Sequence, residues 1–202
     1  MTTIRGAYPV LITPMTQEQE IDWAGVKNNV NYFIDQGVAG IVINGSTGEF
    51  VSLSKEEKFQ MVETVMKEVN GRIPVIVGTA AETTKETIEY TKQAEAHGAD
   101  AALIINPYYM KPKENEIYYH FKEVSSAVNL PIMLYNNPFT SGVNMSTELM
   151  LQIGKDCENV THIKESSGEI GKVRDLARKG KGDFEVFCGA EELVMESYLV
   201  GA

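Results

Sequence analysis

The sequence predicts an α/β fold with a parallel sheet, and three observations support that class. Short apolar runs rich in β-branched residues recur seven times, at residues 8–13, 40–44, 74–78, 101–106, 131–136, 160–164 and 184–189. These runs are continuous and not alternating, which is typical of strands covered by helices on both faces. Segments with helical periodicity separate them, and strand starts recur about every 25–35 residues, the length of one βα unit.

Two intervening segments show the helical pattern most clearly. In the segment from Ser54 to Asn70, one face collects Phe59, Val62, Val65, Met66 and Val69. Ser54 and Glu57 form a capping-box pattern at its start. In the segment from Asp22 to Gln36, the corresponding face collects Val26, Val30, Phe33 and Ile34. A glycine, which tolerates the positive φ that ends many helices, follows predicted helices at Gly37, Gly71, Gly98 and Gly180.

Two architectures fit this order of elements, a doubly wound open sheet and a (β/α)8 barrel. A nucleotide-binding open sheet is expected to carry GxGxxG or GxxxxGK[ST], and neither motif occurs. Polar residues instead follow four different strands, in NGSTGE, NPYY, YNNP and KESSG. Since the carboxyl ends of barrel strands meet at one mouth, this pattern favours a (β/α)8 TIM barrel with about seven strands present.

We expect residues 1–202 to form a single barrel domain, because no linker or low-complexity stretch interrupts the rhythm. An eighth strand would begin at about residues 199–202. Seven strands alone leave unpaired backbone groups along an open seam. The chain is therefore expected to be part of a longer protein, or to have the seam closed by a partner or a rearrangement.

Composition excludes several classes of function. The formal net charge of −10 disfavours binding to nucleic acid or to an anionic membrane. No run of 18 or more apolar residues and no signal-peptide pattern is present, so we expect a cytoplasmic protein. Cys157 and Cys188 lack metal-type spacing and are expected to be reduced, and the three scattered histidines do not form a metal-binding motif. We expect no cofactor.

Lys164 is the first candidate catalytic residue. It ends the apolar run 160–164 and precedes a Ser-Ser-Gly turn. A lysine at a strand end usually extends its ammonium to solvent. In a barrel mouth, however, partial desolvation favours the neutral amine, which can attack a carbonyl carbon and form a Schiff base.

The loop GSTGE (45–49) is a candidate substrate-binding site. A glycine-containing βα loop of this kind is common and can be purely structural. Alternatively, Gly45 lets the backbone approach a ligand, and the backbone N–H groups and hydroxyls of Ser46 and Thr47 can hold a carboxylate. Phosphate is a competing ligand, although no P-loop lysine accompanies the loop, and barrel phosphate sites usually follow the last two strands.

Two tyrosines are candidates for proton transfer. Tyr135 ends the run 131–136, where it can fill the core or, beside a lysine–carbonyl adduct, shuttle protons. Tyr108 and Tyr109 follow the run 101–106 and can extend such a relay.

Together, GSTGE, PYYMKP, YNNP and IKESSG occur in this order on successive strand ends. This joint pattern resembles the dihydrodipicolinate synthase / N-acetylneuraminate lyase family over essentially the whole chain. The resemblance implies a (β/α)8 barrel followed by C-terminal helices, commonly in a dimer or tetramer, and a Schiff base with pyruvate or another 2-oxo acid. The last strand and those helices would lie beyond residue 202.

The resemblance also implies roles for individual residues. Lys164 matches the Schiff-base lysine and Tyr135 the proton-shuttling tyrosine. Thr47 matches the hydroxyl that joins Tyr135 in a relay, and Gly45, Ser46 and Thr47 lie in the loop that binds the keto-acid carboxylate. Tyr109 matches a tyrosine that completes the relay from a neighbouring subunit in the synthase branch.

Thr140 departs from the synthase pattern, which usually has an arginine two residues after the proline of the YNxP motif. Threonine cannot form a bidentate clamp on a second carboxylate. We therefore predict a lyase or aldolase acting on pyruvate or another 2-oxo acid, with a keto-deoxy sugar acid, neuraminate-like or hydroxyproline-pathway substrate. The first alternative is 4-hydroxy-tetrahydrodipicolinate synthase. An alternative of another class is an inactive truncated barrel that binds a small acid or a partner chain.

Overall fold

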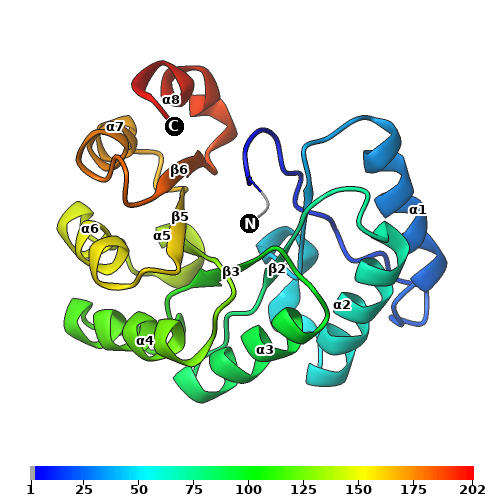
Figure 1. Ribbon diagram of the computed structural model, residues 1–202. Helices are drawn as coiled ribbons and strands as arrows, with labels where there is room; N and C mark the ends of the chain where they lie inside the picture. The colour runs from blue at the N-terminus through cyan, green and yellow to red at the C-terminus, as the bar shows by residue number, and fades with distance from the viewer. Residues whose placement is uncertain (1–2) are drawn as a thin grey trace. The chain divides into compact units, whose positions relative to one another are not determined.

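The computed structural model describes residues 3–202 and contains strands and helices in βα alternation (Figure 1). The strands are β1 (Ile41–Ile43), β2 (Val75–Gly78), β3 (Ala101–Ile105), β4 (Ile132–Asn136), β5 (Val160–Glu165) and β6 (Glu185–Cys188). The α-helices are α1 (Trp23–Asp35), α2 (Lys55–Val69), α3 (Thr84–Ala96), α4 (Glu114–Ala127), α5 (Pro138–Ser141), α6 (Thr147–Asp156), α7 (Ile170–Lys179) and α8 (Val194–Val200). Strand order in the sheet follows the order of the chain.

The chain divides into two compact units. Unit 1 comprises residues 3–79 and 90–102, and unit 2 comprises residues 80–89 and 103–202. Whether residues 1–202 form one domain stays a prediction.

In unit 1, β1 and β2 are parallel, with Ile41 opposite Val75, and α1 packs against α2. The predicted capping box of α2 is confirmed, because Ser54 Oγ accepts from Glu57 N and a Glu57 carboxylate oxygen accepts from Ser54 N. The strand predicted at residues 8–13 is reduced to one parallel bridge between Val10 and Val42. Prolines at both ends of this run lack the N–H that a longer ladder needs.

In unit 2, β4, β5 and β6 are neighbours and all parallel. Helices α4, α6 and α7 lie side by side along them (Figure 1). The core between these layers contains fully buried apolar side chains, among them Ile117, Phe121, Leu134, Ile153 and Ile163.

One predicted helix cap lies at the predicted position but lacks the predicted positive φ, since Gly180 is the C-cap of α7 and its N–H donates to Leu176 O. Gly37, Gly71 and Gly98 have positive φ, as expected, but Gly180 has φ of −91°. A side chain at this position would collide with Phe184, since a Cβ would lie 2.2 Å from the Phe184 ring. Gly180 therefore admits an aromatic side chain and does not supply a left-handed turn.

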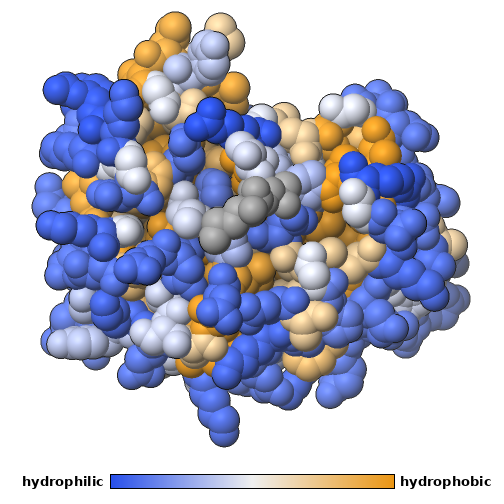
Figure 2. All heavy atoms as spheres, in the orientation of Figure 1, coloured by the Kyte–Doolittle hydropathy of each residue, from blue (hydrophilic) through white to orange (hydrophobic). Residues whose placement is uncertain are grey.

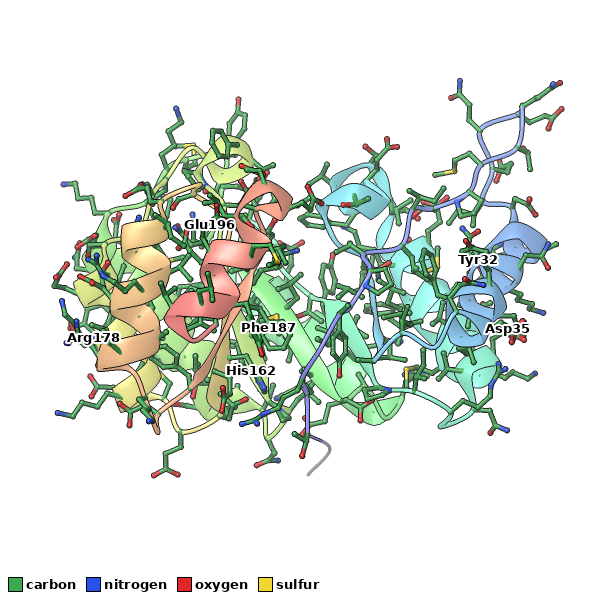
Figure 3. All side chains as sticks on the ribbon, turned by 90° about the horizontal axis from the view of Figure 1, so that it is seen from above. Tyr32, Asp35, His162, Arg178, Phe187 and Glu196 are labelled. Carbon is green, nitrogen blue, oxygen red and sulfur yellow. The ribbon has the colours of Figure 1, made fainter. Side chains whose placement is uncertain are left out.

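Two further features of unit 2 are an aromatic pair on the sheet and an exposed apolar group on its last helix. His162 on β5 and Phe187 on β6 pack edge to face with ring centroids 5.8 Å apart (Figure 3). Helix α8 exposes Val194, Met195, Tyr198 and Leu199, an apolar group that Figure 2 shows at the top of the view. No helix within residues 3–202 is long and apolar enough to cross a membrane.

Candidate active site

Lys164 is the second-last residue of β5 and is only partly buried, whereas its neighbours Ile163 and Glu165 are buried. Successive residues of a strand point to opposite faces, so Lys164 faces away from both neighbours. In register, it lies between Tyr135 on β4 and Phe187 on β6. The sheet therefore places the backbone of Lys164 between those of two aromatic residues.

Tyr135 is the residue that the structure brings to Lys164. The Lys164 Nζ atom lies 4.6 Å from the centroid of the Tyr135 ring, and Tyr135 is 6% exposed. The Tyr135 hydroxyl oxygen accepts a hydrogen bond of 2.8 Å from Asn137 Nδ2. Because this bond uses a lone pair and leaves the O–H proton free to be donated, the phenol is suited to give a proton to a group bound at Lys164.

Asn137 is a site residue that sequence reasoning missed. It is the N-cap of α5, where its Oδ1 accepts from Phe139 N, and its Nδ2 orients the phenol. An asparagine directly before a proline is a recognisable N-cap signal, since proline favours the first helical position. That signal predicts the short helix but not the bond to Tyr135.

Gly189, after β6, borders the lysine on its other side and was also missed. A Cβ at this position would lie 2.7 Å from Lys164 Cε and 2.0 Å from Ser166 Oγ. Within residues 3–202 the buried Ser166 hydroxyl has no hydrogen-bond partner. The lysine side chain thus occupies a space that only glycine at position 189 leaves open.

Thr140 lies exposed on α5, and its hydroxyl donates a long bond of 3.4 Å to Asn137 O. Gly142 ends this helix with φ of 68°, and the Lys111 side chain passes close to it. Tyr109 is 78% exposed in the loop after β3, so its predicted role in a neighbouring subunit's relay stays a prediction.

The loop predicted to bind a carboxylate lies in unit 1. Ser46–Gly48 forms a short 3₁₀-helix that follows the buried Gly45, and Thr47 is exposed. The backbone N–H groups of Ser46 and Thr47 donate to no other described residue. Since Lys164 and Tyr135 belong to unit 2, the relay between Thr47 and Tyr135 stays a prediction.

The part of the chain that the structure describes contains no group of three or more His, Cys, Asp and Glu side chains placed to hold a metal ion. What the arrangement offers chemically is an amine, a phenol with its proton free, and a buried hydroxyl.

Comparison with known proteins gives a consistent result. The sequence matches the dihydrodipicolinate synthetase family over residues 3–202. It is 37% identical over 191 residues to the 4-hydroxy-tetrahydrodipicolinate synthase of Bacillus subtilis (strain 168), which covers 95% of this chain and 66% of the relative. The enzyme of that name from Methanocaldococcus jannaschii is 38% identical over 197 residues, 98% of this chain and 67% of its own length. The chain therefore spans about two thirds of the length of these relatives.

Solved structures agree with the sequence matches. The chloride-inhibited dihydrodipicolinate synthase from Acinetobacter baumannii, complexed with pyruvate, has a TM-score of 0.96 at 38% identity, covering 99% of this chain and 68% of that one. YagE, a prophage protein from E. coli K12 in complex with pyruvate, has a TM-score of 0.92 at 30% identity, covering 96% and 67%. The predicted α/β barrel class is confirmed. The chain belongs to the dihydrodipicolinate synthetase family.

Proposed function

We propose that the protein is a lyase that forms a Schiff base between Lys164 and pyruvate, without a metal or an organic cofactor. The observation that carries the proposal is the registered pair of Lys164 and Tyr135, with the amine 4.6 Å from the centre of the phenol ring. Two solved relatives complexed with pyruvate support pyruvate as the 2-oxo acid.

The residues present can perform each step. The Lys164 Nζ lone pair attacks the keto carbon of pyruvate, and the former carbonyl oxygen takes a proton from the Tyr135 hydroxyl. The resulting carbinolamine loses water, so a C=N bond replaces the C=O bond. The Tyr135 phenolate, held by Asn137 Nδ2, then takes a proton from the methyl carbon and leaves an enamine. The enamine carbon is the nucleophile for an aldehyde, and the reverse sequence cleaves the same carbon–carbon bond.

We infer the direction of the reaction and the second substrate from the names of the curated relatives. A dipicolinate skeleton has seven carbons and a ring nitrogen, so subtracting the three carbons of pyruvate leaves a four-carbon amino acid with an aldehyde. We infer that condensation with such an aldehyde, the synthase reaction, is the first candidate, because the curated relatives bear that name.

Cleavage or formation of a keto-deoxy sugar acid is the second candidate, and one observation favours it. Thr140 lies on the exposed turn where synthases usually carry an arginine, and a neutral hydroxyl cannot clamp a carboxylate. Sugar hydroxyls, in contrast, suit a short polar side chain at that position.

Borohydride reduction tests the proposal directly. The protein is incubated with pyruvate, reduced and digested, and each lysine is examined by mass spectrometry. We expect the mass of a reduced pyruvate adduct on Lys164. An absence of adduct on Lys164 with pyruvate and with a panel of other 2-oxo acids would refute the proposal.

Two variants serve as controls. Lys164→Ala removes the amine and should abolish trapping. Lys181→Ala removes a lysine from the turn before β6 and should leave it unchanged. The wild-type protein is then incubated with pyruvate and either an amino-acid aldehyde or an unsubstituted sugar aldehyde. The product formed separates the two candidate reactions.

A further inference from the structure

Directly beyond the Tyr135–Lys164 pair lies a second registered pair, Asn136 on β4 and Glu165 on β5. Asn136 is 0% exposed and Glu165 is 1% exposed. Asn136 Nδ2 donates to a Glu165 carboxylate oxygen over 2.8 Å. A buried acid is thus bonded to a buried amide one residue past the proposed reacting pair.

The two side chains are fully engaged in hydrogen bonds. The second Glu165 carboxylate oxygen accepts from Ser167 N over 2.6 Å. Asn136 Oδ1 accepts from Met145 N over 3.0 Å, and Asn136 Nδ2 also donates to Asn144 Oδ1. These contacts fix the loop after β5 and the loop after α5 to the ends of the strands.

The backbone of the same two residues adds a further attachment on each side. Asn136 O accepts from Ser166 N over 2.9 Å, and Glu165 O accepts from Gly189 N over 2.8 Å. Gly189 is the residue that borders Lys164 Cε. The pair therefore connects the ends of β4, β5 and β6 at the level of the amine.

A cation stabilises the outer end of this network. Lys172 on α7 donates to Asn144 Oδ1 and to Met145 O, and its Nζ lies 3.6 Å from a Glu169 carboxylate oxygen. The Lys172 side chain is only 9% exposed. The network continues without a break from the buried Glu165 through Asn136 and Asn144 to a sheltered ammonium group.

Stability alone does not call for this arrangement. A buried charge is costly to desolvate, and apolar residues of similar volume often serve a core equally well. Buried polar pairs instead specify one arrangement, since any displacement leaves a donor or acceptor unsatisfied. Here the Asn136–Glu165 pair specifies how the ends of β4 and β5 are arranged, and these strand ends carry the phenol and the amine.

We propose that Asn136 and Glu165 are positioning residues that fix the placement of Lys164 and Tyr135, an inference that rests on the proposed function of Lys164. Neighbouring residues of a strand point to opposite faces, so neither side chain reaches the substrate side of the sheet. They act on the reaction through the strand ends alone.

A swap of the two functional groups tests the inference. Asn136→Asp sets one buried carboxylate against another. Glu165→Gln leaves an N–H group facing either Asn136 Nδ2 or Ser167 N, both of which are donors. The double variant N136D/E165Q restores one donor, one acceptor and a single negative charge across the same gap. Only the bond to Asn144 Oδ1 is not rebuilt.

Two measurements report the reactivity of Lys164 in each variant. The first is the rate at which an amine reagent, trinitrobenzenesulfonate, modifies Lys164 relative to Lys181, read by mass spectrometry without any substrate. The second is the rate of borohydride trapping with saturating pyruvate. We expect each single variant to change both rates about 10- to 100-fold from the wild-type values. The double variant should return both rates most of the way to the wild-type values.

The matched control is Ile153→Val, which removes a methyl group from a fully buried side chain of α6 in the same unit. It should lower the melting temperature without changing the reactivity of Lys164. Wild-type Lys164 rates in both single variants, an equal effect of Ile153→Val, or no recovery in the double variant would each overturn the inference. If pyruvate traps nothing in the wild type while the reagent rates behave as expected, the proposed function fails and the positioning role stands.

Discussion

Gly189 lies where any side chain would collide with the proposed nucleophile. A Cβ there would meet Lys164 Cε at 2.7 Å and Ser166 Oγ at 2.0 Å, and backbone atoms bond this glycine to Glu165 O. Because Gly189 N is anchored, the added methyl group can be accommodated only if both the lysine side chain and Ser166 Oγ move. We expect Gly189→Ala to slow pyruvate trapping on Lys164 at least about tenfold, in proportion to the displacement of the amine.

The control for this prediction is Gly171→Ala in α7, where an added Cβ would meet nothing within 4 Å. This variant should trap pyruvate at the wild-type rate and melt at a slightly higher temperature, since alanine favours the helix by about 1 kcal/mol. Pyruvate trapping at the wild-type rate in Gly189→Ala would contradict the prediction, because it would show that Lys164 can react from another side-chain position.

Thr140 is the residue at which the two candidate reactions can be separated. An arginine at this exposed position supplies the planar guanidinium that binds a carboxylate in a bidentate manner. We expect Thr140→Arg to lower the KM for a carboxylate-bearing aldehyde about tenfold, equivalent to about 1.4 kcal/mol, with the KM for pyruvate unchanged. Steady-state kinetics with each substrate varied in turn measure the two constants.

Thr140→Gln provides a longer, uncharged side chain as the comparison. If Thr140→Gln lowers the same KM as much as Thr140→Arg does, then side-chain length and not charge sets the affinity. An unchanged KM in both variants would place the second carboxylate elsewhere.

At this scale, sequence reasoning named Lys164 and Tyr135 as candidates but did not name the residues that contact them, and the reactive role of both candidates stays a prediction. Lys164 and Tyr135 were predictable because each is a chemically distinctive residue at the end of an apolar run, and the structure places them in register. Asn137 and Gly189 were not predictable, because a hydrogen bond to a phenol and a gap beside a methylene group exist only in three dimensions.

At the scale of elements, α4 carries a histidine that makes the fold sensitive to acid. His120 is 4% exposed, and burial lowers its pKa from 6.5 to about 4. Its Nδ1 lies 2.9 Å from Thr84 Oγ1, whereas Nε2 has no hydrogen-bond partner within the described residues. Protonation would therefore place a positive charge on a buried imidazole ring whose Nε2–H has no hydrogen-bond acceptor within the described residues.

The direction of the pH effect follows from proton binding. Between pH 6.5 and about 4, the unfolded chain binds a proton at His120 and the folded chain does not, so acid favours unfolding. Stability is complete above pH 6.5 and declines below it, by an expected total of about 3 kcal/mol from this group. Urea unfolding at several pH values measures the decline.

His120→Gln should flatten this pH dependence between pH 6.5 and about 4, at some cost in stability near neutral pH. His97→Gln alters an exposed histidine and is the matched control. A pH dependence that persists unchanged in His120→Gln would assign the acid sensitivity to other groups.

Element prediction succeeded where local signals were strong. The capping box of α2 and the positions of six strands were readable because caps and continuous apolar runs act locally. The run at residues 8–13 became a single bridge because Pro9 and Pro14 offer no N–H donors. Gly180 caps α7 as predicted but with negative φ, because the ring of Phe184 and not a left-handed turn requires the glycine. Helix α5 is too short for helical periodicity to reveal it.

For the whole molecule, the order of four motifs at the ends of β1, β3, β4 and β5 indicated the fold class and the family. Each motif alone is compatible with an ordinary loop, but parallel strands bring all their carboxyl ends to one edge, so the order itself is informative. What such an order does not give is the acceptor of the reaction. We expect the acceptor to depend on exposed loop residues such as Thr140.

The last prediction concerns an assembly of two or more copies of the chain and the role of Tyr109 in it. Its ring is 78% exposed, which fits a side chain that serves another copy of the chain. If Tyr109 completes the relay of a neighbouring subunit, a Lys164→Ala protomer retains the tyrosine its partner needs, and a Tyr109→Phe protomer retains the lysine. Each mixed dimer then contains one complete site, whereas neither parent does.

Unfolding and refolding the two variants together at equal concentration should therefore restore activity. Random pairing makes about a quarter of all sites complete, so about a quarter of wild-type activity is expected, above the mean of the two separately refolded parents. Sedimentation of the same mixture establishes whether the chain assembles at all. Activity equal to the mean of the parents, in a mixture shown to contain mixed dimers, would mean that Tyr109 serves its own subunit or none.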